Sequence, residues 1–598
     1  MGKKRSPVAF DGEVYKNYCY FLFKSEDGNT FSIRKHNDVV TGNITTVSAI
    51  LKNNPLISFN GTNYDMPILS ALIDGWTNAD IKALSDAIIV DGLPVWKLSD
   101  RFTQLKIKPT VGHIDLIGCT PLQASLKAYG CRIHSKKLQD LPIDPSALIT
   151  DSDAEILEAY CENDVDVTWD IYRLMLPELM LRAEMTKTYG IDMKSKSDPQ
   201  IAEAIIRHRM EEEGHDVSKR QDAVKPFKYV VPDFIQFGNM VFDEVLEKVR
   251  NCTFKVKDTG NVQLPDEISQ VILYGGAKYK LGIGGLHSQE KRQVVEPKAD
   301  EILGEYDVAS MYPSIIIGQS LYPKHLGKAF IDIYKTLFDE RMSAKRAGNK
   351  TTADTLKIVL NASYGKFGSK YSFLYSPELL IQTTLSGQLA LLMLIERVSA
   401  IGAIVVSANT DGINVLMKRT MKPAVDAICD QWSEDTSYVL EWTEYKATYS
   451  ESVNSYVALK PGGGAKTKGL YESGSIRKGY SAQICNDAIV AYLEHGTPMK
   501  ETINQCNDIR QFLVMRGVRG GGYWNDAPIG KVVRWYYGRD GAPIRYANGN
   551  KVAGSDGAVP LMDLVDYLPS DLDIERYVEI AKQKLKRLGV IVDLCVNY

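Results

Sequence analysis

The sequence predicts a multidomain protein of mixed α/β and α+β architecture. Its 598 residues give room for about three to five domains with separate cores. Short apolar runs that end at acidic residues occur near the N-terminus and in the middle of the chain, and they predict strands that carry these acids to a sheet edge. Between the central runs, residues 327–346 and the segment from Thr351 predict two consecutive helices.

Composition places the chain among ordinary globular proteins. Apolar residues make up 44% of it and charged residues 24%. The net charge of −3 shows no bulk basicity, although a local basic channel can serve a nucleic acid on an acidic protein. The nine cysteines include no C-x-x-C pair, which argues against a zinc or iron–sulfur module and against a disulfide framework. We therefore expect a reducing, cytoplasmic location.

No membrane span is expected. The most apolar stretch, Leu389 to Val406, is interrupted by Glu396 and Arg397 and predicts a helix followed by a strand. The first six residues formally match a myristoylation pattern, but the pattern is short and an apolar strand follows at once.

The first central element is a strand that ends in an acid. Residues 302–308 predict the strand, with Asp307 near its end, and Tyr312-Pro313 opens a short helix because proline is favourable in a first helical turn. Taken alone, Asp307 fits a helix-capping or turn aspartate better than a catalytic acid.

The second central element is a hairpin with an acid at its turn. Apolar runs over 403–406 and 413–416 flank Asn409-Thr410-Asp411-Gly412, and Asp-Gly between two such runs indicates a β-hairpin. A plain turn without a chemical role explains the same residues.

A helical hairpin is predicted between these two acids. Residues 347–349 form a helix stop, and Thr351 with Asp354 fits a capping box that opens the second helix. Arg341 and Lys357 lie equally far from Asn349 along the chain, so antiparallel helices would bring them to the same level.

Three basic residues of this hairpin are candidates to bind phosphate. Arg341 and Lys345 share one helix face, and Lys357, Asn361 and Tyr364 share another. Three cations at one level repel each other unless an anion lies between them, and a triphosphate is a natural counter-charge. The alternative is that they are solvated surface residues. Two carboxylates that bind Mg²⁺ and a cation that binds a triphosphate are the minimum set for nucleotidyl transfer.

A second group of acids lies in the N-terminal part. The strand Val8–Phe10 leads into Asp11-Gly12-Glu13, a strand over 56–59 leads into Asn60 to Asp65, and Tyr160 and Asp164 are one helical turn apart. Four carboxylates at strand ends and on a facing helix would repel each other unless divalent cations lay among them. Unrelated surface acids are the alternative.

These motifs resemble those of the family B DNA polymerases, specifically the compact phage-type replicases. The family's D-x-x-S-L-Y-P occurs as residues 307–313, and K-x-x-x-N-S-x-Y-G as residues 357–365, with Ala362 in place of the first serine. D-T-D occurs as Asn409-Thr410-Asp411, and R-x-x-x-K as Arg341 and Lys345. All of them follow the family's order.

The resemblance implies a polymerase site. Asp307, Val308 and Asp411 would hold two Mg²⁺ ions about 4 Å apart, with Mn²⁺ able to substitute. Arg341, Lys345 and Lys357 would grip the phosphates of the dNTP when the fingers close, and Tyr312 would exclude a ribose 2′-hydroxyl. Asn409 departs from the family because it replaces the first acid of D-T-D, which puts the metal preference in doubt. Further nucleotide-binding residues implied by the resemblance are Ser310, Met311, Asn361 and Tyr364.

The resemblance also implies a 3′–5′ proofreading exonuclease of RNase H-like fold. Its two metal ions would bind Asp11, Glu13, Asp65 and Asp164. Tyr160 would orient the attacking water and Lys137 would contact the scissile phosphate. Asn60 and Tyr64 would contact the frayed primer end.

Two further segments are expected to touch DNA. Gly284 and Gly285 resemble the family's Y-x-G-G segment, although Gly282 replaces the tyrosine, and glycines permit close backbone approach to phosphate. Lys466 and Lys468 lie in a predicted basic hairpin where the family places primer-binding lysines. A loop and a solvated basic turn, respectively, are the alternatives.

The implied fold is an exonuclease domain followed by a right-hand polymerase of palm, helical-hairpin fingers and thumb. Boundaries are expected at 1–185 for the exonuclease domain, 186–290 for a connecting region and the start of the palm, 291–320 and 371–475 for the palm, 321–370 for the fingers and 476–598 for the thumb. The thumb is assigned by position, because the chain there predicts helix and then an irregular aromatic segment.

The implied function is primer extension with proofreading, in phage genome replication. Primer–template DNA and dNTPs are the expected partners, together with a processivity factor, helicase or single-strand-binding protein. We expect a monomer in the cytoplasm, that of the host if the chain is phage-encoded. Short intervals between the motifs argue against protein priming. The alternatives are an exonuclease-dominant repair enzyme and a catalytically silent nucleic-acid-binding protein, the latter suggested by Asn409.

Overall fold

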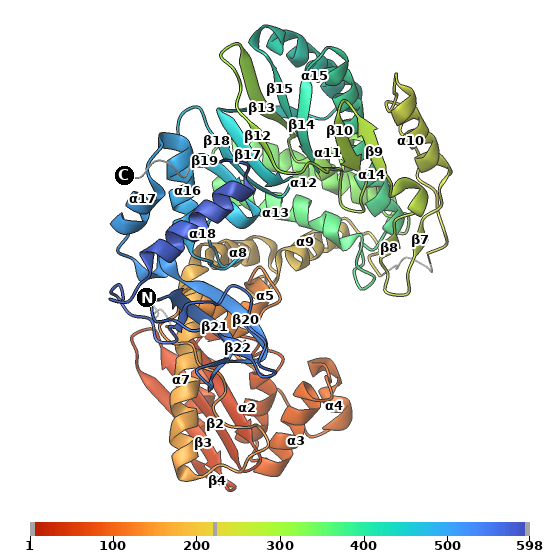
Figure 1. Cartoon of the computed structure of the whole chain (residues 1–598). Helices are drawn as coiled ribbons and strands as arrows, with labels where there is room; N and C mark the ends of the chain where they lie inside the picture. Colours follow the sequence, from red (N-terminus) through yellow and green to blue (C-terminus); the bar gives the residue numbers. More distant parts are fainter. Residues whose placement is uncertain (1–5, 219–223, 592–598) are drawn as a thin grey trace. The chain divides into compact units, whose positions relative to one another are not determined.

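The computed structural model describes residues 6–218 and 224–591, which form two compact units (Figure 1). Unit 1 runs up to Ser197 and adds Gly474–Ile484 and Asn504–Tyr577. Unit 2 holds Asp198–Ser473, Cys485–Ile503 and the chain from Val578. The predicted boundaries of the palm, fingers and thumb remain a prediction, because the contacts divide the chain into these two units only.

Unit 1 is built on a six-stranded sheet of order β4-β3-β2-β1-β5-β6. Strand β1 (Val8–Tyr15) is antiparallel to β2 (Tyr18–Ser25) and parallel to β5 (Leu56–Ser58), which is parallel to β6 (His113–Asp115). The other two strands are β3 (Thr30–His36) and β4 (Val39–Thr41).

Helices cover both faces of this sheet. Side chains alternate along β1, so Ala9 packs in a core with α7 (Asp151–Leu174), while Phe10 packs in a second core with α2 (Asp65–Ile73) and α3 (Asn78–Ile89). A capping box of Thr150 and Asp153 starts α7. Other helices of unit 1 are α1 (Ile44–Asn53), α4 (Leu98–Arg101), α5 (Leu116–Cys119), α6 (Leu126–Arg132) and α8 (Leu176–Tyr189).

The C-terminal part of unit 1 is a four-stranded sheet, which corrects the expectation of an irregular aromatic segment. Strands β20 (Val514–Trp524) and β21 (Ala527–Tyr537) form a long hairpin, flanked by β22 (Arg545–Tyr546) and β23 (Ala558–Pro560). Asn525 and Asp526 make its turn with φ of 48° and 64°, as two-residue hairpins require. Its strands escape prediction because glycines interrupt the alternation of β20.

Unit 2 contains a seven-stranded sheet of order β16-β13-β15-β14-β11-β10-β9. The predicted central strands are β13 (Glu301–Val308), β14 (Ile404–Asn409) and β15 (Gly412–Lys418). Their neighbours are β16 (Leu440–Tyr445), β11 (His287–Ser288), β10 (Ala277–Lys280) and β9 (Val271–Tyr274). Residues 311–318 form the predicted short helix, α11 (Met311–Gly318).

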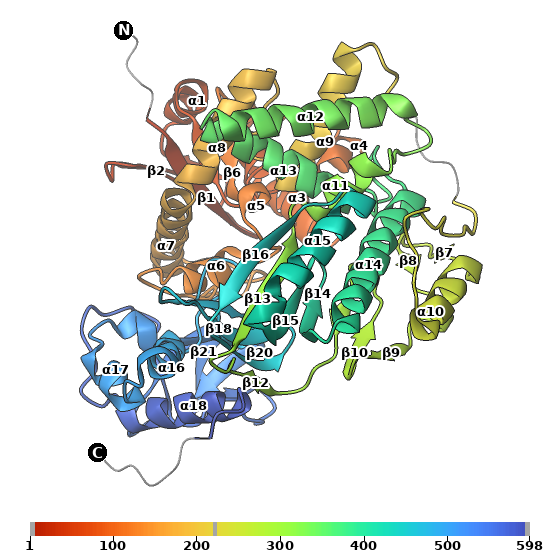
Figure 2. The same ribbon diagram turned by 90° about the horizontal axis from the view of Figure 1, so that it is seen from above.

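The helix predicted before β14 is the core helix of unit 2. It is α14 (Pro377–Ala400), and it lies beside α15 (Lys422–Thr436) along the sheet (Figure 2). By length and composition α14 could cross a membrane, but 83% of its most apolar window is buried within the protein. The charge that interrupts this stretch, Glu396, accepts a hydrogen bond from the Gly238 N–H at 2.8 Å.

The predicted helical hairpin consists of α12 (Lys328–Arg346) and α13 (Lys350–Lys366). The predicted capping box of Thr351 and Asp354 was wrong. Asn349 caps α13 instead, and its side chain accepts a hydrogen bond from the Thr352 N–H at 3.2 Å. A third helix, α9 (Asp198–Glu212), packs on the hairpin, where Lys366 pairs with Glu203 at 2.9 Å.

A smaller sheet of unit 2 carries the predicted basic hairpin. Its order is β12-β17-β18-β19, with β12 (Gln293–Val295), β17 (Ala447–Ser452), β18 (Ser455–Leu459) and β19 (Ala465–Lys468). The remaining elements of the chain include α10 (Met240–Asn251), α16 (Gln483–His495), α17 (Met499–Gln505) and α18 (Ile574–Arg587), together with the pair β7 (Lys255–Val256) and β8 (Val262–Gln263).

Candidate active sites

The four predicted acids of unit 1 come together at the sheet. Asp11 and Glu13 lie on the face of β1 that packs against α7, and Asp164 meets them from that helix. Ligand oxygens of Asp11, Glu13 and Asp164 all lie within 4.8 Å of one another. Burial, followed by the negative charges of Asp65 and Asp164, raises the pKa of Asp11 well above its ordinary value.

Asp65 completes this group from the first turn of α2. The side chain is buried, and its Oδ1 atom has no hydrogen-bond partner among the residues that the structure describes. Burial, followed by the charge of Asp115, raises the pKa of Asp65 to about 8, and burial raises the pKa of Asp164 to about 6. Hard oxygen donors that repel each other in this way fit divalent cations.

A lysine without a motif of its own, Lys127, faces this group. Lys127 on α6 contacts the hydroxyl of Tyr160, and its Nζ atom lies 4.4 Å from the centroid of the Tyr160 ring. Its positive charge lowers the pKa of Glu13 and of Asp164 against the effect of burial. By contrast, Lys137 is exposed, and its backbone pairs with Asp563.

A second residue without a sequence signal holds the loop that carries Asn60. Asp115, at the end of β6, is buried and accepts hydrogen bonds from the backbone N–H groups of Asn60 at 2.7 Å and Thr62 at 2.9 Å. Asn60 has φ of 69°, a left-handed conformation that these bonds stabilise. Tyr64 lies in the same loop, with its hydroxyl 2.9 Å from the Ser85 hydroxyl.

In unit 2, the two predicted acids lie at neighbouring positions of the sheet, Asp307 near the end of β13 and Asp411 in the turn that leads into β15. Asp307 on β13 is directly opposite Gly412 of β15, and the Val308 N–H donates to the Asp411 carbonyl oxygen at 2.7 Å. Burial, followed by the charges of Asp411 and Glu305, raises the pKa of Asp307 to about 7. Burial likewise raises the pKa of Asp411. The raised pKa values of these two carboxylates also fit a divalent cation that binds both of them.

Glycine is required at the turn between these strands. A β-carbon added at Gly412 would lie 2.8 Å from Oδ1 of Asp307. Thr410 has φ of 59°, and its N–H donates to the Leu286 carbonyl oxygen at 2.7 Å. The predicted glycine segment therefore lies beside the acidic turn, where a β-carbon at Gly285 would also meet Thr410, at 2.9 Å.

Asn409 takes part in a polar contact at the same turn. Its amide nitrogen donates to Oδ1 of Asn454 at 3.4 Å, and the Thr410 hydroxyl donates to its Oδ1 at 3.3 Å. The side chain contributes an oxygen without charge beside Asp411.

Several predicted nucleotide-binding residues are brought together. The rings of Tyr312 and Tyr364 stack with centroids 4.1 Å apart and an interplanar angle of 14°. The Tyr312 hydroxyl donates to the Gly284 carbonyl oxygen at 2.6 Å, and Arg341 donates to the Ser310 hydroxyl at 3.0 Å. Met311 is buried in the core of unit 2, so only its backbone is available.

Three other predicted residues face outward on the helical hairpin. Lys345, Lys357 and Asn361 are exposed, and their side chains form no hydrogen bond or ion pair with another residue in the described ranges. They are free to receive a ligand.

The basic hairpin of β18 and β19 is joined to the strand of Asp307 by an ion pair with Glu305. Lys466 pairs with Glu305 at 2.7 Å, and the Tyr445 hydroxyl donates to the same carboxylate oxygen, also at 2.7 Å. The charges of Lys466 and Lys468 lower the pKa of Asp411 against burial. The role of Glu305 was not predicted, because the pairing depends on the packing of two separate sheets.

Comparisons with known proteins find a partial match in sequence and a match to one solved structure. No family model matches the chain. DNA polymerase II of Escherichia coli K12 is 29% identical over 136 residues, a match that spans 19% of this chain and 17% of that protein. The family B DNA polymerase from the hyperthermophilic archaeon Pyrobaculum calidifontis matches 99% of this chain and 79% of its own, with 14% identity and a TM-score of 0.43. Over the 136 residues matched in sequence, this chain is similar to a DNA polymerase.

Proposed function

We propose that the chain is a template-directed DNA polymerase with a 3′–5′ proofreading exonuclease. The observation that carries the proposal is the presence of two separate carboxylate groups, one in each unit, in which burial and like charge raise the pKa values. Such carboxylates destabilise the fold when they are charged, and a bound divalent cation removes that repulsion.

In unit 2, Asp307 and Asp411, with the carbonyl of Val308, would hold two Mg²⁺ ions, for which Mn²⁺ could substitute. When bound, these cations activate the primer 3′-hydroxyl and neutralise the leaving pyrophosphate. Arg341, Lys345 and Lys357 bind the phosphates of the incoming dNTP.

Tyr312 selects deoxynucleotides in this proposal. Its ring is fixed by the stack on Tyr364 and its hydroxyl by Gly284, so it forms a rigid surface under the sugar. A ribose 2′-hydroxyl would collide with that surface. Base pairing with the template then selects which dNTP is incorporated, in a pocket lined by Asn361 and Tyr364.

In unit 1, Asp11, Glu13, Asp65 and Asp164 would hold the two cations that assist phosphodiester hydrolysis. Tyr160 orients the attacking water. Asp115 holds the loop that carries Asn60, and Asn60 and Tyr64 would contact the single-stranded primer end.

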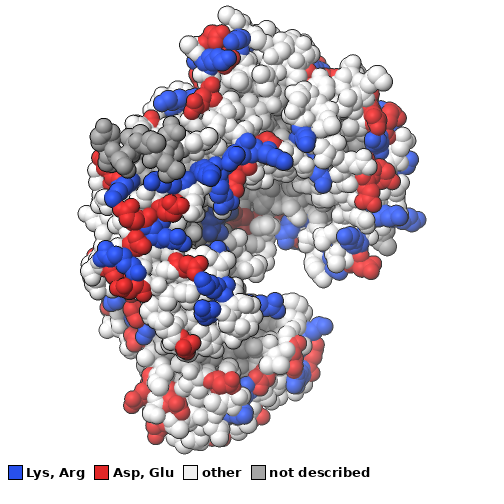
Figure 3. Space-filling view, in the orientation of Figure 1, with Lys and Arg blue, Asp and Glu red and all other residues white. Residues whose placement is uncertain are grey.

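A basic surface supports DNA binding by a chain whose net charge is −3. Figure 3 shows a band of Lys and Arg side chains over α18, most of which belongs to unit 2. Lys582, Lys586 and Arg587 are exposed on this helix, and Lys466 is exposed on β19. Such residues contact phosphates without reading sequence.

We further propose a monomeric replicase that works on primer–template DNA in the cytoplasm, that of the host if a phage encodes it. A processivity factor, a helicase and a single-strand-binding protein are its proposed accessory partners.

The proposal is tested by incubating the purified chain and a 5′-labelled primer on a longer template with dNTPs, in Mg²⁺ and in Mn²⁺. We expect extension to the template end. Asn409→Asp, which restores the acid, is expected to extend with a changed Mg²⁺-to-Mn²⁺ preference. Shortening without extension in both metals would replace the proposal by an exonuclease-dominant repair enzyme, and no reaction at all would favour a silent binding protein.

A further inference from the structure

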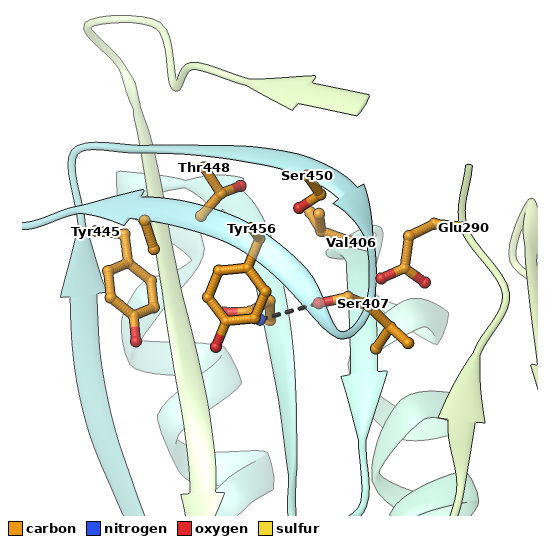
Figure 4. A pocket seen from close by; sticks show the side chains of 10 residues that line it. Glu290, Val406, Ser407, Tyr445, Thr448, Ser450 and Tyr456 are labelled. Atoms are coloured by element: carbon orange, nitrogen blue, oxygen red, sulfur yellow. Dashed lines mark hydrogen bonds between the residues drawn. The ribbon is translucent and has the colours of Figure 1, made fainter. Parts of the chain in front are cut away.

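One face of the seven-stranded sheet is open beside Asp307. Tyr306 and Val308 on β13 point to the opposite face, where they pack in the core with α14. Farther from the acids, the smaller sheet covers the open face, and Leu303 of β13 is buried beneath it. Figure 4 shows part of this cover, three residues of the smaller sheet beside β14: Tyr456, Thr448 and Ser450. Asp307 itself is only half-buried, so this cover does not extend over the acidic end of the sheet.

A continuous row of residues crosses this open face. Residues directly opposite each other on antiparallel strands point to the same face of a sheet. The register from β13 through β15, β14, β11 and β10 to β9 joins six such residues: Asp307, Gly412, Asn409, His287, Lys280 and Val271. The Nε2 atom of His287 lies beside the acidic turn, 3.5 Å from the Thr410 hydroxyl. The row therefore leads from Asp307 to the hairpin of β9 and β10.

Two lysines lie at the far end of this row. Lys280 belongs to the row, and Lys278 lies two residues earlier on β10, so both side chains point to the open face. This spacing places their Cα atoms about 7 Å apart. Both lysines are exposed, and neither forms an ion pair within residues 6–218 and 224–591. Each is therefore available to bind an anion.

Two aliphatic side chains accompany the lysines on the edge strand β9. Val271 is directly opposite Lys280, and Leu273 is directly opposite Lys278. Val271 is 46% exposed and Leu273 is 63% exposed, whereas Ile272 between them is buried in the core. Edge strands usually present charged rather than aliphatic side chains to solvent. Adjacent exposed aliphatic groups beside two cations therefore indicate a surface that a partner covers.

The partner must offer negative charge and apolar faces together. Phosphates supply the charge, and base faces pack on apolar side chains. In a duplex the base faces are stacked on each other, so a single strand of nucleic acid fits this surface better than a duplex does. Strand β10 is four strands from β13, a distance of about 19 Å at a spacing of about 4.8 Å. A single strand that runs along the row to Asp307 would pass over His287 and Asn409.

We propose that the open face of β9 and β10 binds the single-stranded template as it approaches the acids of unit 2. Lys278 and Lys280 bind its phosphates, and Val271 and Leu273 pack against its bases. The inference rests on the proposed function, because primer extension leaves the template single-stranded ahead of the primer 3′ end. Phosphate contacts and apolar packing carry no sequence information, so this surface binds a template of any sequence.

The test measures binding of the full chain to two labelled primer–templates by fluorescence anisotropy, with a chelator to prevent cleavage. One template overhang is too short to reach β10, and the other is long enough to pass it. We expect wild type to bind the long overhang more tightly. Lys278→Ala combined with Lys280→Ala should weaken binding of the long overhang by about 10-fold and lower its salt slope by about 1.4, from two lost single-strand contacts. Binding of the short overhang should not change. Lys255→Ala combined with Lys257→Ala, an exposed pair with the same spacing, is the control.

A second measurement separates the base contacts from the phosphate contacts. Leu273→Ser should weaken binding of the long overhang, but it should not weaken binding of an abasic overhang of the same length. Equal melting temperatures of the variants and wild type exclude unfolding as the cause. Wild-type binding that ignores overhang length would overturn the proposal, and so would an equal loss for both overhangs in the double lysine variant, which would place duplex DNA on these lysines. None of these readouts requires primer extension, so failure here is distinct from failure of the proposed function.

Discussion

At the scale of single residues, the acids of both candidate sites have raised pKa values, because their charged forms are unfavourable in the folded chain. Burial and like charges raise the pKa of Asp164 to about 6, of Asp307 to about 7 and of Asp65 to about 8. The folded chain therefore favours the protonated acids, and a bound divalent cation would reverse that preference. The motifs were enough to predict these acids, because the strand ends and the turn of one helix determine where they lie.

Stability in the absence of divalent cations should depend on pH. Because the folded pKa values of these acids exceed the ordinary value, their contribution to stability is complete below about pH 4 and is lost as pH rises through 6 to 8. We expect the melting temperature with chelator to fall between pH 5 and pH 9, and Mg²⁺ to remove the fall. Asp307→Asn should show a smaller fall in melting temperature over the same pH range. A wild-type melting temperature that does not change with pH would contradict the assignment of raised pKa values to these acids.

Lys127 should matter more to primer shortening than Lys137. Lys127 contacts Tyr160 beside the acids, whereas the Lys137 side chain is exposed. We expect Lys127→Met to slow shortening by about 10²-fold, as loss of one electrostatic group in a catalytic site does. Lys137→Met is the matched control, measured with the same labelled primer without dNTPs. Equal rates for the two variants would exclude a special role for Lys127.

The sequence could not predict Lys127 or Asp115. Lys127 reaches the acids only because α6 packs against α7, and Asp115 reaches the Asn60 loop only because β5 and β6 are parallel neighbours. Both contacts join residues far apart in the chain, and neither residue type has a distinctive spacing. By contrast, Asp307 and Tyr312 belong to one contiguous motif, so the sequence alone was enough to predict that they lie near each other.

At the scale of elements, turn chemistry was the most predictable feature. Asp-Gly predicted the β14–β15 hairpin, which the structure confirms. The start of α13 was misassigned because Asn349 and Thr351 are both good capping residues two positions apart, and the hydrogen bond to Thr352 selects Asn349. The β20–β21 hairpin was missed because its glycines weaken the strand signal.

Gly412 should be essential to the acidic hairpin. An added methyl group would lie 2.8 Å from Oδ1 of Asp307, and backbone holds both residues, so the Asp307 carboxylate must move. We expect Gly412→Ala to lower primer extension by about 10²-fold, the effect of a misplacement of about 1 Å in a catalytic group. Gly462→Ala, where an added methyl group meets open space, should extend normally. Wild-type extension by Gly412→Ala would show that Asp307 tolerates displacement.

At the scale of the whole molecule, the chain passes between the two units several times. Residues 504–577 belong to the unit that holds the N-terminal sheet, and the chain from Val578 belongs to the other. Position along the sequence could not predict this grouping, because it depends on non-local packing such as the buried Arg534, which donates to the Ser135 carbonyl oxygen at 2.9 Å.

Binding of duplex DNA should weaken with salt through the basic surface of α18. Each phosphate contact that is lost lowers the slope of log affinity against log salt by about 0.9. We expect the double variant Lys582→Ala, Lys586→Ala to lower that slope by about 1 to 2, measured by fluorescence anisotropy of a labelled primer–template. Lys255→Ala, exposed on β7, is the control. An unchanged slope would place the DNA on another surface.

The central claim is that the two carboxylate groups are two separate catalytic sites. The most direct test follows a 5′-labelled primer on a longer template in Mg²⁺, with and without dNTPs, for wild type, Asp411→Ala and Asp65→Ala. We expect Asp411→Ala to lose extension and keep shortening, and Asp65→Ala to lose shortening and keep extension. Loss of both reactions in either folded variant, or of neither in both, would contradict the claim.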